Sequence, residues 1–337
     1  MKITRIEQIK VAVPYIEGIR KYRPNEHVEQ PILLIEMHTD EGAVGLGDGG
    51  RGADISAEIP HWIGRDPAAV DLSRTSAPFS HALYDILGKV AGLPAHRLMG
   101  SQRRTQVPVG YWSCHMEPED TAREAERGAR LGFKTHKLKA RPWNIVRTVE
   151  LMSQAAGPDY AIIVDPNFYF ETLPASLRLA RQLESYNIHC FEDPFPFDDW
   201  DQYALFRQKS SIPLAAHLHT PVDVLTAVRH QAADYFNLGG DNFDVTYRCA
   251  AIADAAQRQV WLQEEKDLSL GVAAAYAAHV GSVIPNAVIP LDILHFLREN
   301  DLIHQALAPR EGLIQVPEGA GLGVELDREA VAHYRVA

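Results

Sequence analysis

The sequence has few cysteines, and their positions exclude a disulfide-stapled protein. Only three occur in 337 residues, at Cys114, Cys190 and Cys249, and no two of them form a CxxC pair. Domains that depend on disulfides carry an even set of cysteines at close spacing, which this chain does not have. We therefore expect a protein of the reducing cytoplasm.

Two further absences limit the partners of the chain. Lys and Arg form no dense run and the formal net charge is -11, so neither nucleic acid nor an anionic membrane surface is expected as a partner. No apolar run approaches the roughly 20 residues of a membrane-spanning helix, and residues 1–15 contain no signal-peptide hydrophobic core. An acidic chain can still bind an anionic small molecule through a local group of cations or a metal ion.

The order of the apolar runs predicts an antiparallel unit followed by a parallel barrel. Residues 1–50 read as strands joined by a "TDEG" hairpin turn, and "FSHALYDILGKVAG" has the apolar spacing of a helix that ends near Gly92. From residue 107, eight short apolar runs alternate with helical segments at steps of about 20 to 28 residues, the length of a strand–helix unit. Eight such units predict a (β/α) barrel. The expected strand ends lie near Ser113, Lys139, Asp165, Glu192, His217, Asn237, Glu264 and Asp292.

Most of the predicted strand ends carry ionisable side chains, and the active sites of such barrels lie at these ends. Lys137 and Lys139 share one face of the second strand, and Asp165 and Glu192 end the next two. Taken alone, "VDPN" is typical of a turn and "FEDP" of a strand end before a helix cap. Their regular register is the signal. Two carboxylates offer the hard oxygen ligands that suit Mg²⁺, and a lysine desolvated beside another cation can act as a base.

The motifs "HKLKA", "VDPN", "FEDP" and "IPLA" together resemble the mandelate racemase and muconate lactonizing branch of the enolase superfamily. The segments "ALYDILGKVAGLPAHRLMG" and "VPEGAGLGVELD" are similar to flanking parts of that family. The resemblance implies an N-terminal α+β capping domain over residues 1–105, with residues 310–337 packing back on it. It also implies a modified (β/α)7β barrel over residues 106–309. A bound Mg²⁺ would stabilise the enediolate formed when the proton α to a carboxylate is removed.

The resemblance also implies roles for single residues. Lys139 matches the second lysine of the family's KxK motif, the usual base, and Lys137 matches the first, which usually contacts the substrate carboxylate. Asp165 and Glu192 match the first two metal ligands, and Asn167 matches a polar position that lines the site.

The first departure from the family pattern concerns the third metal ligand. The family has a carboxylate at the end of the fifth strand, where this chain reads "AAHLH". His217 is the first candidate for that ligand and His219 the second. The alternative is a histidine that only lines the pocket or caps the next helix. An imidazole ligand would make Mn²⁺ or another divalent metal an alternative to Mg²⁺.

The second departure concerns the second acid/base group. The sixth-strand region, "DYFNLGGDN", lacks the lysine of the lactonizing members, and the seventh strand ends in "LQEE" without a histidine. Glu264 is the nearest substitute as an acid. Gln263 and Glu264 point to opposite faces of a strand, so only one of them can face the barrel mouth. Alternatives are Glu265, Lys266, Asp267 and Asp292.

These residues predict an enzyme that acts on a small carboxylate, which Arg51, Arg141 and Trp143 are candidates to hold. With one clear base, dehydration of a hydroxy-acid or sugar acid is the leading interpretation. Racemisation, epimerisation or cycloisomerisation of a small carboxylic acid is the alternative, and a barrel that binds a carboxylate without turnover is an alternative of another class. The family resemblance also implies a homo-oligomer.

Overall fold

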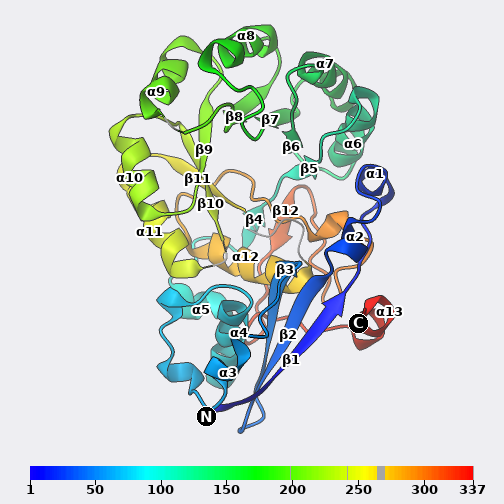
Figure 1. Ribbon diagram of the computed structural model, residues 1–337, viewed down its shortest axis with the longest axis vertical. Coiled ribbons are helices and arrows are strands. Elements are labelled where there is room, and N and C mark those ends of the chain that lie inside the picture. Colours follow the sequence, from blue (N-terminus) through cyan, green and yellow to red (C-terminus); the bar gives the residue numbers. More distant parts are fainter. Residues whose placement is uncertain (198, 241, 264–269, 337) are drawn as a thin grey trace.

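The computed structural model of the chain describes residues 1–197, 199–240, 242–263 and 270–336. Figure 1 shows an antiparallel sheet at one end of the molecule and a larger parallel sheet, with helices around it, at the other. No described helix has both the length and the apolar character that a membrane crossing requires.

The N-terminal unit is a three-stranded antiparallel sheet with one long helix packed on it. Its strands are β1 (Ile3–Val11), β2 (Ile32–Thr39) and β3 (Val44–Arg51), in the order β1-β2-β3. Gly45 and Gly47 in β3 allow this packing. A Cβ at Gly45 would lie 2.1 Å from the carbonyl oxygen of Ala82, and one at Gly47 would lie 2.2 Å from that of Pro78. The remaining elements are α1 (Glu17–Arg20), α2 (Glu26–Glu29), α3 (Ile59–Trp62), the 3₁₀ turns Pro67–Ala69 and Leu72–Arg74, α4 (Phe79–Ala91) and α5 (Ala95–Met99).

The parallel sheet has seven strands, and neighbours along the chain are neighbours in the sheet. The strands are β5 (Tyr111–Ser113), β6 (Thr135–Lys139), β7 (Ala161–Asp165), β8 (Ile188–Glu192), β9 (Leu214–Leu218), β10 (Tyr235–Gly239) and β11 (Gln259–Gln263). The helices after them are α6 (Pro118–Arg130), α7 (Ile145–Ala156), α8 (Leu173–Leu183), α9 (Trp200–Lys209), α10 (Pro221–Arg229), α11 (Phe243–Ala255) and α12 (Gly271–Val283). The alternation of strand and helix is therefore the one that the sequence predicts.

The predicted eighth strand is an irregular segment that closes the barrel. Residues 287–292 form isolated parallel bridges to Val260 and Gln263 on one side and to Val109 on the other. The backbone N–H of Asp292 donates to the Leu262 carbonyl at 2.9 Å, and that of Gly110 donates to the Leu291 carbonyl at 3.1 Å. Pro290 has no N–H to donate, which fits a bridge rather than a regular ladder here.

The first predicted barrel strand is split, because its two halves have different partners. β4 (Gln106–Pro108) pairs in antiparallel fashion with β12 (Leu313–Gln315), and the barrel strand β5 begins only at Tyr111. A 3₁₀ turn at His295–Leu297 lies between the closing segment and β12. The C-terminal helix α13 (Arg328–Tyr334) returns to the edge of β1, where Ala12 N–H donates to the Tyr334 carbonyl at 2.9 Å (Figure 1).

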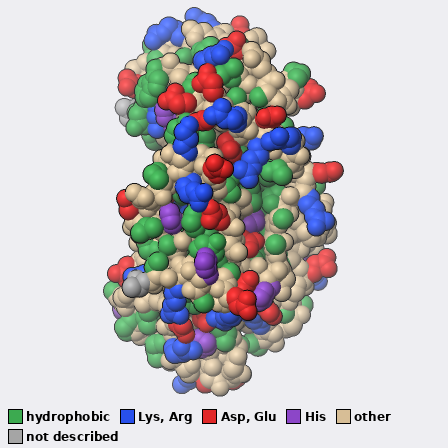
Figure 2. Space-filling view, turned by 90° about the vertical axis from the view of Figure 1, so that its right-hand side faces the viewer, with side chains coloured by type: hydrophobic (Ala, Val, Ile, Leu, Met, Phe, Trp, Pro, Cys, Tyr) green, Lys and Arg blue, Asp and Glu red, His purple; other side chains and the backbone are tan. Residues whose placement is uncertain are grey.

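The surface in Figure 2 carries acidic and basic side chains interspersed with each other. On that face, positive charge is broken up by negative charge rather than gathered into a continuous basic strip.

Candidate active site at the carboxyl ends of the barrel strands

The parallel register brings two lysines and two carboxylates together inside the barrel. Lys139 is the direct partner of Asp165 across β6 and β7, and Lys137 lies two residues earlier on the same face. Glu192 ends the next strand, β8. Lys137, Asp165 and Glu192 are all buried to 1% exposure or less. The four residues predicted from strand-end spacing therefore share one site.

Lys137 is a fixed cation at the base of this site. Its Nζ donates to Glu192 Oε1 at 3.0 Å, to Asp292 Oδ2 at 2.8 Å and to Gln263 Oε1 at 3.0 Å, and it lies 3.5 Å from Asp165 Oδ2. Burial alone would lower the pKa of Lys137, but the surrounding carboxylates outweigh burial and raise it well above its ordinary value. Its ammonium faces protein carboxylates and supplies positive charge at the base of the site.

Lys139 is the lysine of the pair nearer to the barrel mouth. Its Nζ donates to Asp165 Oδ2 at 2.7 Å, and its side chain is 15% exposed where that of Lys137 is 2% exposed. Burial would raise the pKa of Asp165, but the two ammonium groups lower it below its ordinary value. Lys139 can therefore reach a bound molecule, and Asp165 is ionised beside it.

Two amide side chains and one indole hold this group in place. Asn237 Nδ2 donates to Glu192 Oε1 at 2.8 Å and to Gln263 Oε1 at 2.9 Å. Trp261 Nε1 donates to Asp292 Oδ2 at 3.3 Å. The sequence marked Asn237 only as a strand end and assigned no role to Trp261. The alternation of β10 and β11 could have placed both inside the barrel, but their contact with Glu192 and Asp292 depends on the closing segment.

A second group of side chains lies beside the lysines. Glu192, Asp193 and His217 each place a ligand atom within 4.8 Å of the others, and we call them the barrel triad. Burial raises the pKa of Glu192 to about 7; the negative charge of Asp165 adds to this rise, and Lys137 opposes it. Burial, with Lys137 as the next cause, holds the pKa of His217 well below its ordinary value. His217 is therefore a neutral imidazole, the form that ligates metal ions.

The described residues of the site fit a divalent cation. Among the described residues, four carboxylates, including those of Asp193 and Asp292, lie beside two ammonium groups, so the fully ionised cluster would carry two surplus negative charges. His217 Nε2 is buried and has no hydrogen-bond partner among the described residues. Glu192 Oε2 lies 2.9 Å from Lys137 Nζ but makes no hydrogen bond there. Charge and donor atoms are both available to a metal ion.

The other predicted site residues lie around the barrel mouth or outside it. Asn167 is exposed with φ of 45°, and its backbone N–H donates to Asp165 Oδ1 at 3.0 Å. Trp143 is 69% exposed. The Arg141 guanidinium lies 3.8 Å from the centre of the Tyr169 ring. Glu264 and its alternatives Glu265, Lys266 and Asp267 lie outside the described residues.

The N-terminal unit, which we call the capping unit and its sheet the capping sheet, contacts the barrel strand β5 through a cluster centred on Glu26. Arg51 and Arg23 both form ion pairs with Glu26, and Tyr15 donates to Glu26 Oε1 at 2.7 Å. The Arg23 guanidinium lies 5.3 Å from the ring centre of Trp112, a β5 residue beside the site. Arg51 thus lies in the capping unit, in a cluster that also contacts the barrel strand β5.

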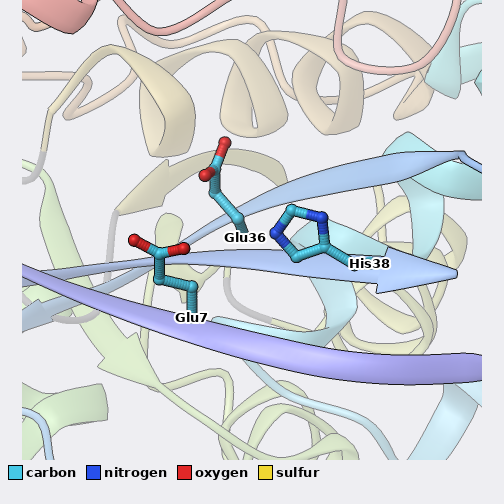
Figure 3. Close-up of side chains that lie close together, drawn as sticks. All are labelled: Glu7, Glu36 and His38. Atoms are coloured by element: carbon cyan, nitrogen blue, oxygen red, sulfur yellow. The ribbon is translucent and has the colours of Figure 1, made fainter.

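A second group with metal-ligand spacing lies on the capping sheet, away from the barrel. Glu7, Glu36 and His38 point toward one another from β1 and β2 (Figure 3), and we call them the capping-sheet cluster. Their charge balance is the reverse of that in the barrel. Three arginines contact them and outnumber the two carboxylates, which disfavours a cation. These arginines are Arg5, Arg328 and Arg335, of which the last two belong to or follow α13. The cluster ties the C-terminus to the capping sheet.

Comparison with known proteins gives one consistent group of matches. Residues 120–330 match the family model described as enolase C-terminal domain-like. The chain is 24% identical to N-succinyl-L-Arg/Lys racemase of Bacillus cereus, with 100% of this chain and 98% of that protein covered. It is 26% identical to D-xylonate dehydratase of Haloferax volcanii, with 91% and 86% covered. A solved structure of a mandelate racemase/muconate lactonizing family protein from Azoarcus sp. EbN1 superposes with a TM-score of 0.84 at 25% identity, covering 100% of this chain and 98% of that one.

Proposed function

The chain belongs to the enolase superfamily, in the mandelate racemase and muconate lactonizing branch, and we propose that it removes the proton α to a substrate carboxylate with a divalent cation bound. We propose further that this step begins the dehydration of a hydroxy-acid or sugar acid. The observation that carries the proposal is the position of Lys139, a lysine at the barrel mouth beside two buried carboxylates at the ends of adjacent strands.

In this proposal the two lysines have different tasks. Lys139 takes the α-proton as the neutral amine, because its Nζ is the one that lies toward the mouth. Asp165 orients Lys139 through their hydrogen bond of 2.7 Å. Lys137 stays charged beneath them and offsets the negative charge of Glu192 and Asp292. The division follows from burial, since a lysine with three acceptors and almost no exposure cannot move toward a substrate.

The residues that would hold the cation are Asp165, Glu192 and His217, and we assign Mg²⁺ or another divalent metal such as Mn²⁺ to them. When bound, the cation stabilises the negative charge that develops on the substrate carboxylate as the α-proton leaves. Asn237 keeps Glu192 directed into the site through its hydrogen bond of 2.8 Å to Oε1.

We favour dehydration over racemisation because of the side chains that β10 and β11 present to the site. Among the described residues, β10 presents Asn237 and ends at Gly239, and β11 ends at Gln263. An amide does not accept a proton at neutral pH, whereas two-base racemisation needs a base on each face. Elimination needs one base and an acid for the departing hydroxyl. We keep Glu264 as the proposed acid.

Substrate contacts are proposed for residues on the loops that follow the strand ends. Arg141 and Trp143 follow β6, and Asn167 follows β7, where the loops of such barrels form the binding site. Arg51 would contribute from the capping unit. Together they would hold a polar, anionic substrate over Lys139.

The test is a screen of sugar acids and small hydroxy-acids in D₂O with MgCl₂ or MnCl₂ present. Formation of a 2-keto acid is the expected result, and the Lys139→Ala variant should not produce it. Deuterium at the α-carbon without keto-acid formation would favour racemisation or epimerisation instead. Metal binding without either change would favour the barrel that only binds a carboxylate.

A further inference from the structure

We propose that Asp193 is a metal ligand in this chain and that Asp193 and His217 together give the site a preference for Mn²⁺ or Co²⁺ over Mg²⁺. The inference rests on the proposed function, because it concerns the same cation. It adds Asp193 as a ligand, which strand periodicity does not predict. It also states which divalent metals the site should prefer because His217 stands where the family has a carboxylate.

The backbone of Asp193 brings its side chain to the same place as that of Glu192. Consecutive residues of a regular strand point to opposite faces, so Asp193 would be expected to point away from the barrel interior. Its φ of 47° is in the left-handed region, which breaks the alternation directly after β8. The result is a carboxylate that is 4% exposed and lies within 4.8 Å of the ligand atoms of Glu192 and His217.

Helix capping does not account for this conformation. The helix after β8 is α9, and its N-cap is Asp199, which accepts from the backbone N–H of Asp201. Asp193 Oδ1 instead accepts from the backbone N–H of His217 at 3.0 Å, so the carboxylate is fixed across β8 and β9. A buried carboxylate held in this way beside Glu192 raises the electrostatic cost of the site unless a cation is present.

The ring of His217 supplies the second, independent observation. Its Nε2 is buried without a hydrogen-bond partner among the described residues, although a buried ring nitrogen normally has one. The same ring belongs to the barrel triad, so one of its nitrogens lies within 4.8 Å of the ligand atoms of Glu192 and Asp193. The neighbouring ring of His219 lies 4.5 Å away between centroids but is not part of the triad.

The capping-sheet cluster shows why spacing alone is not sufficient. Like the barrel triad, it consists of two carboxylates and one histidine whose ligand atoms lie within 4.8 Å of one another. However, His38 Nε2 lies 2.9 Å from Arg5 Nη2, and Arg328 Nη1 donates a hydrogen bond to Glu36 Oε2 at 3.1 Å. In the capping-sheet cluster, the guanidinium groups already supply the positive charge that a metal ion would supply. In the barrel triad the ring nitrogen of His217 is still available.

The donor set determines the metal preference. Mg²⁺ favours six oxygen ligands in octahedral geometry and takes imidazole poorly, whereas Mn²⁺ and Co²⁺ accept mixed nitrogen and oxygen ligands. For such a site the affinity order of divalent metals rises from Mn²⁺ to Co²⁺. Together with Asp165, the barrel triad offers three carboxylates and one imidazole, and the imidazole predicts tighter binding of Mn²⁺ than of Mg²⁺, and of Co²⁺ than of Mn²⁺.

The experiment uses the full chain after metal depletion, titrated with MgCl₂, MnCl₂ and CoCl₂ by calorimetry. Nitrogen coordination is read from pulsed electron paramagnetic resonance of the Mn²⁺-bound protein. The variants are Asp193→Asn and His217→Gln, and the matched control for the second is His219→Gln. Asp193→Asn keeps an oxygen that can accept from His217 N–H and tolerates positive φ, so it removes charge without removing the local structure. Glu7→Gln controls for the capping-sheet cluster.

We expect Mn²⁺ to bind at least about tenfold more tightly than Mg²⁺. Asp193→Asn and His217→Gln should each weaken Mn²⁺ binding by about 100-fold. Mutation of residues that only support a metal ligand typically weakens metal binding by about 10-fold to 100-fold, and loss of a ligand should reach the upper end of this range. The nitrogen modulation should be lost in His217→Gln and kept in both controls. Circular dichroism and thermal unfolding of each variant separate lost ligation from lost folding.

Two other outcomes would overturn different statements. If Mn²⁺ binds without nitrogen modulation and Asp193→Asn has unchanged affinity, the inference is wrong, but a metal-assisted function on carboxylates alone stands. If neither Mg²⁺, Mn²⁺ nor Co²⁺ binds to the depleted wild-type chain, the metal-dependent function and this inference are both wrong.

Discussion

The ammonium of Lys139 donates a hydrogen bond of 2.7 Å to Asp165 Oδ2, across strand ends that are directly paired between β6 and β7. The contact orients the one lysine of the pair that is partly open to the barrel mouth. Since Asp165 is fully buried and ionised, it fixes the direction of the Lys139 side chain without needing solvent.

Replacing Lys139 by Ala should lower the rate of α-proton exchange by about 100-fold to 10,000-fold, the range for loss of a positioned general base. Mn²⁺ affinity should not fall, because Lys139 offers no ligand atom to the cation and its loss removes a positive charge beside Asp165. The measurement is deuterium incorporation at the α-carbon of a turned-over acid, followed by mass spectrometry. Lys134→Ala, an exposed lysine just before β6, is the control and should be unaffected. Exchange at the wild-type rate in Lys139→Ala would exclude Lys139 as the base.

Lys137 should be important for stability rather than for proton transfer. Lys137→Met leaves Glu192 and Asp292 buried without their cation, and breaking a buried ion pair by removing one partner typically costs about 3 to 5 kcal/mol. The free energy of unfolding in urea measures the loss. Combining Lys137→Met with Asp292→Asn should recover part of it, because the second change removes an uncompensated charge. A loss below about 1 kcal/mol for the single variant would contradict this account.

The sequence predicted the barrel because the fold depends on a repeated property. Apolar runs at a regular step specify strand, helix and strand order, and side chains two residues apart share a face. For this reason the spacing of the motifs is sufficient to place Lys137, Lys139, Asp165 and Glu192 together. Their strands end where the sequence indicates, at Lys139, Asp165 and Glu192.

The rest of the site could not be predicted, because it depends on contacts between segments far apart in the chain. The positive φ of Asp193 breaks the alternation of side chains between the two faces of the strand, and the sequence "FEDP" does not predict this φ. Asp292 meets Lys137 only because an irregular, proline-containing segment closes the barrel. The sequence does not show whether Gln263 or Glu264 faces the barrel mouth, and the hydrogen bonds of Gln263 to Lys137 and Asn237 follow from the closed sheet.

Metal removal should lower the free energy of unfolding by an amount that depends on the free metal concentration relative to the dissociation constant. A ligand that binds only the folded chain adds about 2.7 kcal/mol when its free concentration is 100 times its dissociation constant. Urea unfolding with MnCl₂ at that concentration, and again with excess EDTA, measures the difference. Glu192→Gln should lose most of the metal-dependent increment, and Glu7→Gln in the capping-sheet cluster should retain it. An equal increment in both variants would place the bound metal elsewhere.

The contact between β3 and α4 gives a prediction about packing. In Gly47→Ala the added methyl group would lie 2.2 Å from the Pro78 carbonyl oxygen, a backbone atom that cannot rotate away. We expect a loss of about 1 to 3 kcal/mol or more in the free energy of unfolding. Gly49→Ala in the same strand is the graded control, since its nearest contact is the Ala53 methyl group at 3.2 Å. Equal stability of the two variants would show that α4 does not lie this close to β3.

The free energy of unfolding should fall at acidic pH, in part because several histidines are buried as neutral rings. Burial lowers the pKa of His136 to about 3 and those of His279 and His295 to about 4. In the unfolded chain a histidine has a pKa of about 6.5, so between these values the unfolded state binds more protons. Stability contributed by each neutral ring is therefore complete above about pH 6.5 and is lost as the pH falls toward the folded-state pKa.

For His136 this relation predicts a loss of about 2 kcal/mol between pH 7 and pH 5. The raised pKa of Glu192 acts in the opposite direction over much of this range, so the total slope of the wild-type chain does not isolate the effect. The comparison with His136→Gln does, because that variant lacks the titrating ring. Urea unfolding at pH 7 and pH 5 should show a smaller acid loss in His136→Gln than in the wild type, and the exposed His61→Gln should match the wild type. Identical pH dependence in His136→Gln and the wild type would mean that His136 is protonated within the folded barrel, against its enclosure between Ser113 and Tyr160.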